Sequence, residues 1–407
     1  MRMAVVRPFR ALRPSRDSAP DVSSVPYDVV STEEAREITA QNPSSFLRVT
    51  RAEVDLPAGT DPYSDEVYAK ARENFAAVRE SAPMILDDAP AVYFYRLRMG
   101  GHEQTGIAAG FSVDDYERDV IKKHERTRRD KEDDRTRHII ELRAQTGVVF
   151  LTFRSTDEID RCARAVTADE PLYDFRAADG VHHSVWKAGA AESACLLEAF
   201  GGIPALYIAD GHHRAASAAR ARGELRARGD AGDADTFIAV AFPDRETQIL
   251  PYNRTVRDLA GQTPEQFLAA VGGGVPVREG SATPRHKGEV AMFVAGRWYT
   301  IDLSQAAPAD GSRASGLDVA LLQRHVLERH LKIGDVRTDK RIDFVGGARG
   351  VAALEAAVQQ ERAAVAFAMY PVTIDDLMSI ADEGGIMPPK STWFEPKLRD
   401  GLLVHLI

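Results

Sequence analysis

The most constraining feature of this chain is a short apolar run, residues 203–209, that leads directly into Asp-Gly-His-His-Arg and then an alanine-rich run. The apolar run predicts a buried strand, and the alanine-rich run predicts a helix. We call residues 210–214 the DGHHR segment. A glycine in such a turn lets a phosphate approach the backbone, and the free N–H groups of the first helical turn favour an anion. The sequence therefore predicts an anion-binding turn, and one that lacks the G-x-x-x-x-G-K-[ST] pattern of a P-loop.

The residues of the DGHHR segment have candidate roles and simpler alternatives. Gly211 allows the close approach of phosphate, and Arg214 offers a two-pronged contact to it. Asp210 is a candidate Mg²⁺ ligand and also a candidate helix N-cap, two roles that are compatible. His212 and His213 are adjacent, so their side chains point in different directions, and no clear third ligand lies at metal-site spacing. An ordinary turn with hydrogen-bonding histidines is the alternative interpretation.

A second feature is a charged segment, residues 117–137, which holds nine Lys or Arg and seven Asp or Glu residues. One interpretation is a solvated helix with pairs such as Arg128 and Glu132. The other is a flexible segment that orders over bound nucleotide, with Glu125, Glu132 or Asp134 holding magnesium or orienting arginines. In a helix, four basic residues three or four positions apart share one face: His124, Arg128, Lys131 and Arg135.

Other polar positions are weaker candidates. Asn253 and Arg254 follow a strand-like run, where a turn is the usual explanation, but strand ends also line ligand crevices. We therefore expect Asn253 to contact ribose or phosphate and Arg254 to contact phosphate. Asp28 is either a turn aspartate or a general base. Lys390, in a proline-stiffened loop, is either a contact to an anionic group or part of a structural lid.

Composition excludes several classes of function. The 407-residue chain carries a formal net charge of −9, which argues against a nucleic-acid binder that works by counterion release. The N-terminus has arginines and no apolar core of a signal peptide, and no run of 18 apolar residues predicts a membrane span. Cys162 and Cys195 fall in helix-like apolar patterns and are predicted to be reduced core residues of a cytoplasmic protein.

The pattern of strands and helices predicts a mixed α+β fold. Runs 91–99 and 103–113 alternate and are joined by two glycines, which indicates a hairpin, while residues 64–81 predict an amphipathic helix and 46–49 a strand. Hairpins together with β-α units exclude an all-parallel doubly wound sheet. Near the C-terminus we expect, in order, a strand, a helix, a strand and a helix at 342–345, 351–359, 363–370 and 374–383, with Thr373 capping the last helix.

The DGHHR segment, between its strand and its helix, resembles the phosphate-binding motif of the ParB/sulfiredoxin-like superfamily, in which a G-x-x-R or G-C-H-R element grips nucleotide phosphates. More closely, the chain resembles a large bacterial domain-of-unknown-function family allied to the free L-serine kinases. Four blocks carry this resemblance: SSVPYDVVS (23–31), IKKHERTRRDKEDDR (121–135), YIADGHHRAASA (207–218) and IMPPKSTWFEPKLRDGLLVHLI (386–407). The resemblance implies a ParB/sulfiredoxin-like nucleotide-binding core with additional α/β elements.

This core suggests a three-part organisation of the chain. Residues 1–115 form an N-terminal α+β region with the hairpin, and residues 116–260 form the nucleotide-binding core with the charged segment and the DGHHR segment. Residues 261–407 form a C-terminal α/β region. Loop or linker candidates are the glycine tripeptide 272–274 and residues 306–315.

The resemblance also implies an activity: a Mg²⁺-dependent kinase that transfers a phosphoryl group from ATP or ADP to a small hydroxylated amino acid, L-serine first, giving O-phosphoserine. The turn from Gly211 to Arg214 then holds phosphates, Asp210 places Mg²⁺, and His212 or His213 stabilises the transferring group. The general base is Asp28 or, alternatively, Glu53. The remaining nucleotide-binding candidates are His124, Arg128, Lys131, Asn253 and Arg254.

Two rival functions remain open at this point. One is a non-catalytic or slowly hydrolysing nucleotide-binding regulator, which keeps the phosphate site but needs no base. The other is a metal-dependent phosphohydrolase, ranked last because it needs several convergent ligands. The expected partners are a nucleotide and a small molecule, with no nucleic acid and no membrane, and the oligomeric state and the nucleotide donor stay open.

Overall fold

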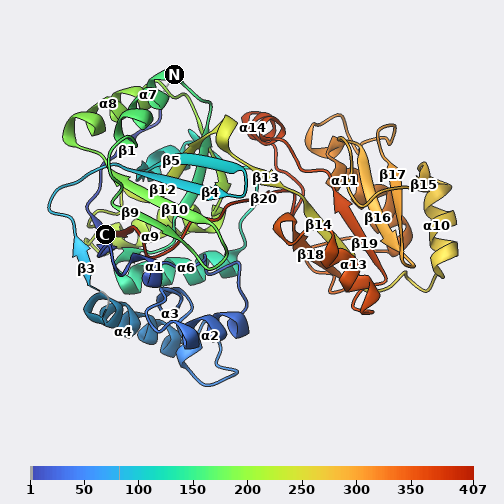
Figure 1. Ribbon diagram of the computed structural model, residues 1–407, viewed down its shortest axis with the longest axis horizontal. Coiled ribbons are helices and arrows are strands. Elements are labelled where there is room, and N and C mark those ends of the chain that lie inside the picture. The colour runs from blue at the N-terminus through green and yellow to red at the C-terminus, as the bar shows by residue number, and fades with distance from the viewer. Residues whose placement is uncertain (1–2, 82) are drawn as a thin grey trace. The chain divides into compact units, whose positions relative to one another are not determined.

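The computed structural model describes residues 3–81 and 83–407 and has the mixed α+β fold predicted from the sequence (Figure 1). The chain divides into two compact units. Unit 1 comprises Met1–Thr247 and Pro396–Ile407, and unit 2 comprises Gln248–Glu395. Each unit has its own sheets and its own buried residues.

Unit 1 is built on a nine-stranded mixed sheet in the order β6-β11-β8-β12-β5-β4-β10-β9, with β1 pairing to β5. Its strands are β1 (Val6–Arg7), β4 (Tyr93–Met99), β5 (His102–Ser112), β6 (Ile121–Lys122), β8 (Val149–Phe153), β9 (Tyr173–Arg176), β10 (His182–Lys187), β11 (Leu206–Asp210) and β12 (Thr236–Pro243). Strand β12 is parallel to β8 and buried along its whole length, which explains its uninterrupted apolar sequence.

Helices and a small second sheet complete unit 1. The second sheet has the order β3-β2-β21-β7, with strands β2 (Ala11–Pro14), β3 (Met84–Leu86), β7 (Ala144–Gln145) and β21 (Val404–Leu406). The helices are α1 (Ala19–Val22), α2 (Thr32–Gln41), α3 (Leu47–Thr50), η1 (Ala52–Asp55), α4 (Asp65–Ser81), α5 (Val113–Glu117), α6 (Arg129–Leu142), α7 (Asp157–Val166), α8 (Ala190–Phe200), α9 (His212–Ala227) and η2 (Asp244–Glu246).

The alanine-rich run after the DGHHR segment becomes helix α9, as predicted. Its residues Ala215, Ala218 and Ala221 recur at helical spacing and belong to the same buried cluster as the central strands. Small side chains on one face let a helix pack closely on its neighbours. Helix α9 is therefore held by packing along its length, which positions its N-terminus at the end of β11.

Unit 2 contains a six-stranded sheet in the order β15-β17-β16-β19-β14-β18 and a short pair of strands. Its strands are β13 (Ile249–Leu250), β14 (Tyr252–Val256), β15 (Val277–Glu279), β16 (Glu289–Val294), β17 (Arg297–Asp302), β18 (Ile342–Gly346), β19 (Val365–Met369) and β20 (Trp393–Phe394). Its helices are α10 (Pro264–Gly272), η3 (Ala314–Gly316), α11 (Asp318–Leu322), η4 (Gln323–Glu328), α12 (Arg329–Leu331), η5 (Gly347–Arg349), α13 (Ala352–Gln359) and α14 (Ile374–Asp382).

Several local predictions are confirmed. The hairpin is β4 and β5, helix 64–81 is α4, and the strand-helix-strand-helix series near the C-terminus is β18, α13, β19 and α14. Thr373 caps α14, because its hydroxyl accepts the backbone N–H of Asp376 at 3.0 Å. In each case the prediction rested on periodicity over a long run or on a specific turn or cap residue.

Two local predictions are wrong. Residues 46–49 form no strand but lead into the short helix α3, where Phe46, Leu47 and Val49 are buried. A short apolar run is compatible with either element, and here tertiary packing decides. The two cysteines are not both core residues, because Cys162 is buried but Cys195 is exposed, with the two sulfur atoms 2.7 Å apart.

The two compact units differ from the three ranges expected from the sequence. The last segment of the chain returns to unit 1, where β21 pairs with β2 near the N-terminus and with β7. Such pairing between distant parts of a chain leaves no local sign in composition. Among the described residues, no helix is long and apolar enough to cross a membrane.

The hairpin provides a test of the packing in unit 1. A Cβ atom on Gly106 would lie 2.6 Å from Val240 Cγ1 and 2.8 Å from Phe242 Cδ1, in strand β12. We expect Gly106→Ala to lower the free energy of unfolding by about 1–3 kcal/mol, because over-packing forces the strands apart. Urea denaturation measures this. The control is Gly101→Ala at the tip of the hairpin, where a Cβ meets nothing within 4 Å; equal losses in the two variants would contradict the packing.

Candidate functional site

The candidate site lies where two adjacent parallel strands end. Strand β6 pairs in parallel with β11, with Ile121 beside Leu206 and Lys122 beside Tyr207. The segments that follow these strands therefore leave the sheet at the same edge, as ligand-binding loops commonly do. One is the DGHHR segment, and the other we call the HERTR loop, residues 124–128. The sheet thus brings together two motifs that are far apart in sequence.

Gly211 forms the turn between β11 and α9 in a conformation that favours glycine. Its φ is +93° and its ψ is 30°, in the left-handed region. A Cβ atom at this position would also lie 3.3 Å from the guanidinium of Arg214. Gly211, and not Asp210, is the N-cap residue of α9, and it makes no side-chain capping bond. The first-turn N–H groups are consequently available to an anion.

Arg214 is a buried ion-pairing residue at the centre of the site. Its side chain is only 7% exposed, and one terminal nitrogen donates to the backbone carbonyl of Val148. The other, Nη2, lies 3.3 Å from Asp28 Oδ2 and 3.7 Å from Asp210 Oδ1. Its Nε is buried with no hydrogen-bond partner in the described part of the chain. The sequence predicts an arginine that faces phosphate, whereas the structure engages this guanidinium with carboxylates.

The charge of Arg214 is secured by its surroundings. Burial by itself lowers the pKa of an arginine, but three carboxylates, on Asp28, Asp210 and Asp400, raise the pKa of Arg214 above its ordinary value. The guanidinium therefore stays protonated throughout the pH range in which the protein is folded. It acts as a fixed cation around which three acidic side chains gather.

Asp210 is held by cations from two directions. Lys397 Nζ donates to Asp210 Oδ2 at 3.1 Å, opposite the contact with Arg214. Burial raises the pKa of Asp210, but Lys397 and Arg214 outweigh it and lower the pKa below its usual range. A Mg²⁺ ion at Asp210 would have to displace Lys397 or Arg214, so the residues present do not fit the ion there. No local pattern in the sequence assigns Lys397 to this site, because the residue belongs to the C-terminal segment that returns to unit 1.

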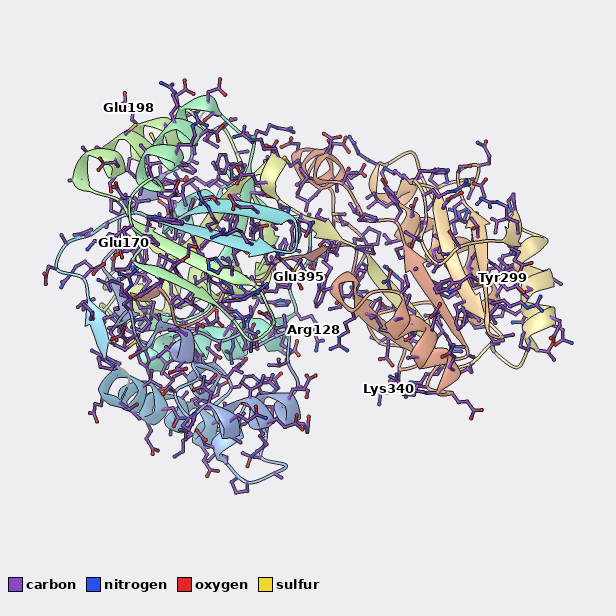
Figure 2. The ribbon with its side chains drawn as sticks, in the orientation of Figure 1. Arg128, Glu170, Glu198, Tyr299, Lys340 and Glu395 are labelled. Atoms are coloured by element: carbon purple, nitrogen blue, oxygen red, sulfur yellow. The ribbon has the colours of Figure 1, made fainter. Side chains whose placement is uncertain are left out.

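The two adjacent histidines anchor the HERTR loop. His213 Nε2 accepts the backbone N–H of Arg128 at 2.9 Å, and His212 Nε2 accepts that of His124 at 3.5 Å. A ring nitrogen that accepts an N–H carries no proton of its own, and burial lowers the pKa of both histidines. Arg128, labelled in Figure 2, ends this loop just before α6. Neutral imidazoles therefore tie the HERTR loop to the start of α9.

His124 is the most deeply buried polar residue of the loop. Its side chain is 2% exposed, and its ring lies edge-on to that of His212, with ring centroids 4.5 Å apart. Neither ring nitrogen makes a hydrogen bond of standard geometry among the described residues, and the backbone carbonyl of Ile208 acts on the ring only through a looser contact. Burial lowers the pKa of His124 to about 4, so the ring is neutral at pH 7.

The basic residues of the charged segment do not form the expected ridge. Helix α6 begins only at Arg129, so His124 and Arg128 precede it. Lys131 donates to the hydroxyl of Tyr63 at 2.7 Å, and Arg128 pairs with Asp130 at 2.6 Å instead of with Glu132. Arg135 is turned inward, where it pairs with Asp134 and lies over the ring of Tyr27. Packing of α6 on α9 and α4 disperses these cations.

The two candidates for a general base occupy different surroundings. The side chain of Asp28 is 39% exposed and contacts Arg214 in the site. Glu53 is 5% exposed, lies 3.0 Å from Arg51 Nε and accepts from the hydroxyl of Thr32 at 3.3 Å. Only Asp28 both reaches the guanidinium of α9 and remains open to solvent.

Three sequence candidates lie in unit 2 and have structural contacts there. Asn253 Oδ1 accepts the backbone N–H of Met369 at 3.0 Å. Arg254 is buried, donates to the carbonyl of Lys390 at 2.9 Å, and lies over the ring of Phe344. Burial lowers the pKa of Arg254 to about 10. These contacts hold β14 in its sheet, and roles in nucleotide binding stay predictions.

The ion-pair cluster predicts a large cost for removing Arg214. Arg214→Ala leaves Asp28, Asp210 and Asp400 without their shared cation, so the free energy of unfolding falls by about 3–5 kcal/mol. The control on the same helix is Arg228→Ala, whose exposed pair with Glu224 (58% and 45% exposed) predicts a loss of about 0–1 kcal/mol. Guanidinium chloride denaturation of wild type and both variants measures these losses in the free energy of unfolding. Equal losses would show that Arg214 is not the centre of the cluster.

Asp400 predicts a pH dependence of stability. Burial raises the pKa of Asp400 to about 7, above the ordinary value of 3.8, although Arg214 opposes this. The folded protein therefore binds one proton more than the unfolded chain between about pH 4 and pH 7, and the stability contributed by this carboxyl falls as the pH rises through that window. Asp400→Asn removes that fall.

Urea denaturation at pH 5 and pH 8 measures the effect. We expect the difference in stability between Asp400→Asn and wild type to move in favour of the variant as the pH rises, and to level off above pH 7. Asp88→Asn, at an exposed position, serves as the control and is expected to keep the pH dependence of wild type. A constant difference between Asp400→Asn and wild type would contradict the raised pKa.

Comparison with known proteins places the chain in a family. Solved structures to which it is similar include SbnI with C-terminal truncation from Staphylococcus aureus (12% identity, TM-score 0.39, 74% of this chain and 87% of that chain covered). Others are a free serine kinase in complex with AMP (12%, TM-score 0.37, 73% and 91%) and a conserved hypothetical protein from Pyrococcus furiosus (14%, TM-score 0.35, 74% and 95%). No curated protein matches the chain. The family model described as "Protein of unknown function (DUF1015)" matches residues 6–320, well over half of the chain, and the protein therefore belongs to that family.

Proposed function

We propose that this protein is a nucleotide-dependent phosphotransferase that acts on a small hydroxylated amino acid, with L-serine as the first candidate acceptor. One observation carries the proposal. The uncapped N-terminus of α9, which suits phosphate, begins one turn before a guanidinium that holds the carboxylate of Asp28. An anion-binding turn and a candidate base therefore share one site.

The phosphates bind at the first turn of α9. Phosphoryl transfer requires little covalent chemistry from a protein and depends on positioning and on neutralising phosphate charge. The first-turn N–H groups supply donors, and the helix dipole adds positive potential. Lys397 and Arg214 bring two cations to the same end of the helix. The HERTR loop, tied to His212 and His213, borders this turn and covers bound nucleotide.

Asp28 accepts the proton of the acceptor hydroxyl. A general base must lie within hydrogen-bond reach of the hydroxyl and must be fixed in orientation. Asp28 meets the second condition through Arg214, and its partial exposure leaves it accessible to a small substrate. Arg214 is a positioning residue in this scheme, because its contacts are with carboxylates and with the backbone.

Donor and acceptor follow from the sequence resemblance to the free L-serine kinases. ATP or ADP is the donor, and O-phosphoserine is the product. When bound, Mg²⁺ would neutralise phosphate charge. Because Asp210 is engaged by Lys397 and Arg214, we derive no step from an ion at this carboxylate.

A nucleotide-binding regulator is the second candidate, and one contact favours it. The same ion pair that orients Asp28 also occupies one of its carboxylate oxygens, Oδ2, so the residue fits a purely structural role. A regulator needs the turn at Gly211 but no base. The two functions therefore differ in whether wild type phosphorylates an acceptor at all, and a variant that keeps the size of Asp28 and removes its charge tests its role as the base.

Asp28→Asn tests whether Asp28 is the general base, and the wild-type assay separates the phosphotransferase from the regulator. We expect the variant to lower the rate of serine phosphorylation by about a hundredfold or more, as loss of a general base usually does, and to leave nucleotide affinity nearly unchanged. Phosphorus NMR with ATP or ADP and a panel of hydroxylated amino acids follows the reaction, and calorimetry follows nucleotide binding. Asp21→Asn, an exposed position in α1, is the matched control.

The alternative results identify the alternative functions. Phosphoserine formed at equal rates by wild type and Asp28→Asn would remove Asp28 from the role, and Glu53→Gln is then the next variant to assay. Tight nucleotide binding by wild type without any phosphorylated acceptor would overturn the phosphotransferase and leave the regulator. Absence of nucleotide binding would overturn both.

A further inference from the structure

The buried imidazole of His124 is poorly hydrogen-bonded in the structure. Both of its ring nitrogens are buried, and neither makes a hydrogen bond of standard geometry among the described residues. The backbone carbonyl of Ile208 acts on the ring only through a looser contact. An unsatisfied buried polar group destabilises a fold, and a native protein keeps one mainly where a strained, catalytic or ion-binding role requires it. The edge-on contact with His212 buries the ring, and one carbonyl such as that of Ile208 can serve only one of the two ring nitrogens. The ring is therefore expected to have a ligand.

Two other ligand-bearing side chains lie next to His124. Ligand atoms of His124, Glu125 and His212 all lie within 4.8 Å of one another. Bonds from nitrogen or oxygen to a first-row metal ion are about 2.0–2.2 Å long, so such atoms reach a common ion after small rotations. Glu125 is exposed, and His124 and His212 are buried.

We propose that His124, His212 and Glu125 bind one divalent first-row transition metal ion at the edge of the sheet, where α9 begins. Two imidazoles and one carboxylate are a common ligand set for zinc and for non-haem iron, and three protein ligands leave coordination positions open. Imidazole ligands disfavour Mg²⁺, which prefers oxygen. This site is distinct from the sequence-based assignment of Mg²⁺ to Asp210.

The surroundings of the two imidazoles suit such an ion. A metal ligand must be an unprotonated imidazole, and both rings are buried, His124 at 2% and His212 at 6% exposed. The long contact of 3.5 Å from the backbone N–H of His124 to His212 Nε2 is weak and easily exchanged for a metal bond.

The location gives the ion a function in binding anions. His212 is the first residue of α9, so the open coordination positions lie beside the uncapped N–H groups of that helix. An oxygen of an anionic ligand that reaches the first turn of α9 is thereby close enough to bind the metal as well. The proposal does not rest on the phosphotransferase, because metal binding requires neither nucleotide nor acceptor.

The test uses the full-length protein and the metals alone. We expect metal-free wild type to bind one equivalent of Co²⁺ with visible absorption, and Zn²⁺ to displace it. His124→Phe keeps a ring of similar shape and removes both nitrogens, so it should weaken Co²⁺ and Zn²⁺ binding at least tenfold. Since it also removes buried polar atoms that lack well-formed hydrogen bonds, the fold of the metal-free variant should be about as stable as wild type.

A second variant and a control make the result decisive. Glu125→Gln, at an exposed position, keeps the size of the side chain and should also weaken metal binding at least tenfold. His102→Phe, in a hairpin where the imidazole bonds only to Gln104 among the described contacts (3.1 Å), should bind metal as wild type does. Zn²⁺ should raise the melting temperature of wild type and His102→Phe and leave that of the two site variants unchanged.

Two results would overturn the proposal. One is that wild type binds neither Co²⁺ nor Zn²⁺. The other is that wild type, His124→Phe and Glu125→Gln bind these ions equally. Failure of serine phosphorylation has no bearing on either result, because each assay contains metal and protein only, so the two proposals can fail separately.

Discussion

The buried guanidinium of Arg214 is the interaction on which the site depends. It joins the turn at Asp28, the end of β11 at Asp210 and the backbone at Val148, three segments far apart in sequence. A buried charge is costly unless it is paired and hydrogen-bonded. Burial of the guanidinium therefore requires these acidic groups beside it, and loss of either partner would leave an unpaired charge. A side chain at Gly211 would crowd the guanidinium of Arg214, so the ion cluster requires a glycine in this turn.

The adjacent histidines His212 and His213 hold the HERTR loop against helix α9. They are neutral, they accept backbone N–H groups of the HERTR loop, and they bring His124 against the start of α9. The cations of the charged segment, by contrast, are distributed among Asp130, Tyr63 and Asp134. The site is therefore narrower than a polyphosphate-binding ridge and consists of one helix N-terminus with its nearest acidic, cationic and imidazole groups.

The mixed sheet places these groups by a simple geometric rule. Parallel neighbours β6 and β11 end at one edge, so two loops emerge side by side. The small face of α9 then fixes the helix axis against the core. Within unit 2, Asn253 accepts the backbone N–H of Met369 in the neighbouring strand, and Arg254 donates to the carbonyl of Lys390.

The sequence by itself determined the elements with a strong local signal: the β4–β5 hairpin with its glycine turn, helix α4, the capped helix α14, and the β11–Gly211–α9 turn. It also indicated the family through four blocks of residues. Only the tertiary structure decided which side chains meet. The ion pair of Lys397 with Asp210, the inward turn of Arg135 and the approach of His124 and Glu125 to His212 each join segments through strand pairing or helix packing. Periodicity and propensity describe neighbours in the chain, whereas these contacts depend on burial and charge pairing between distant residues, which no local pattern encodes.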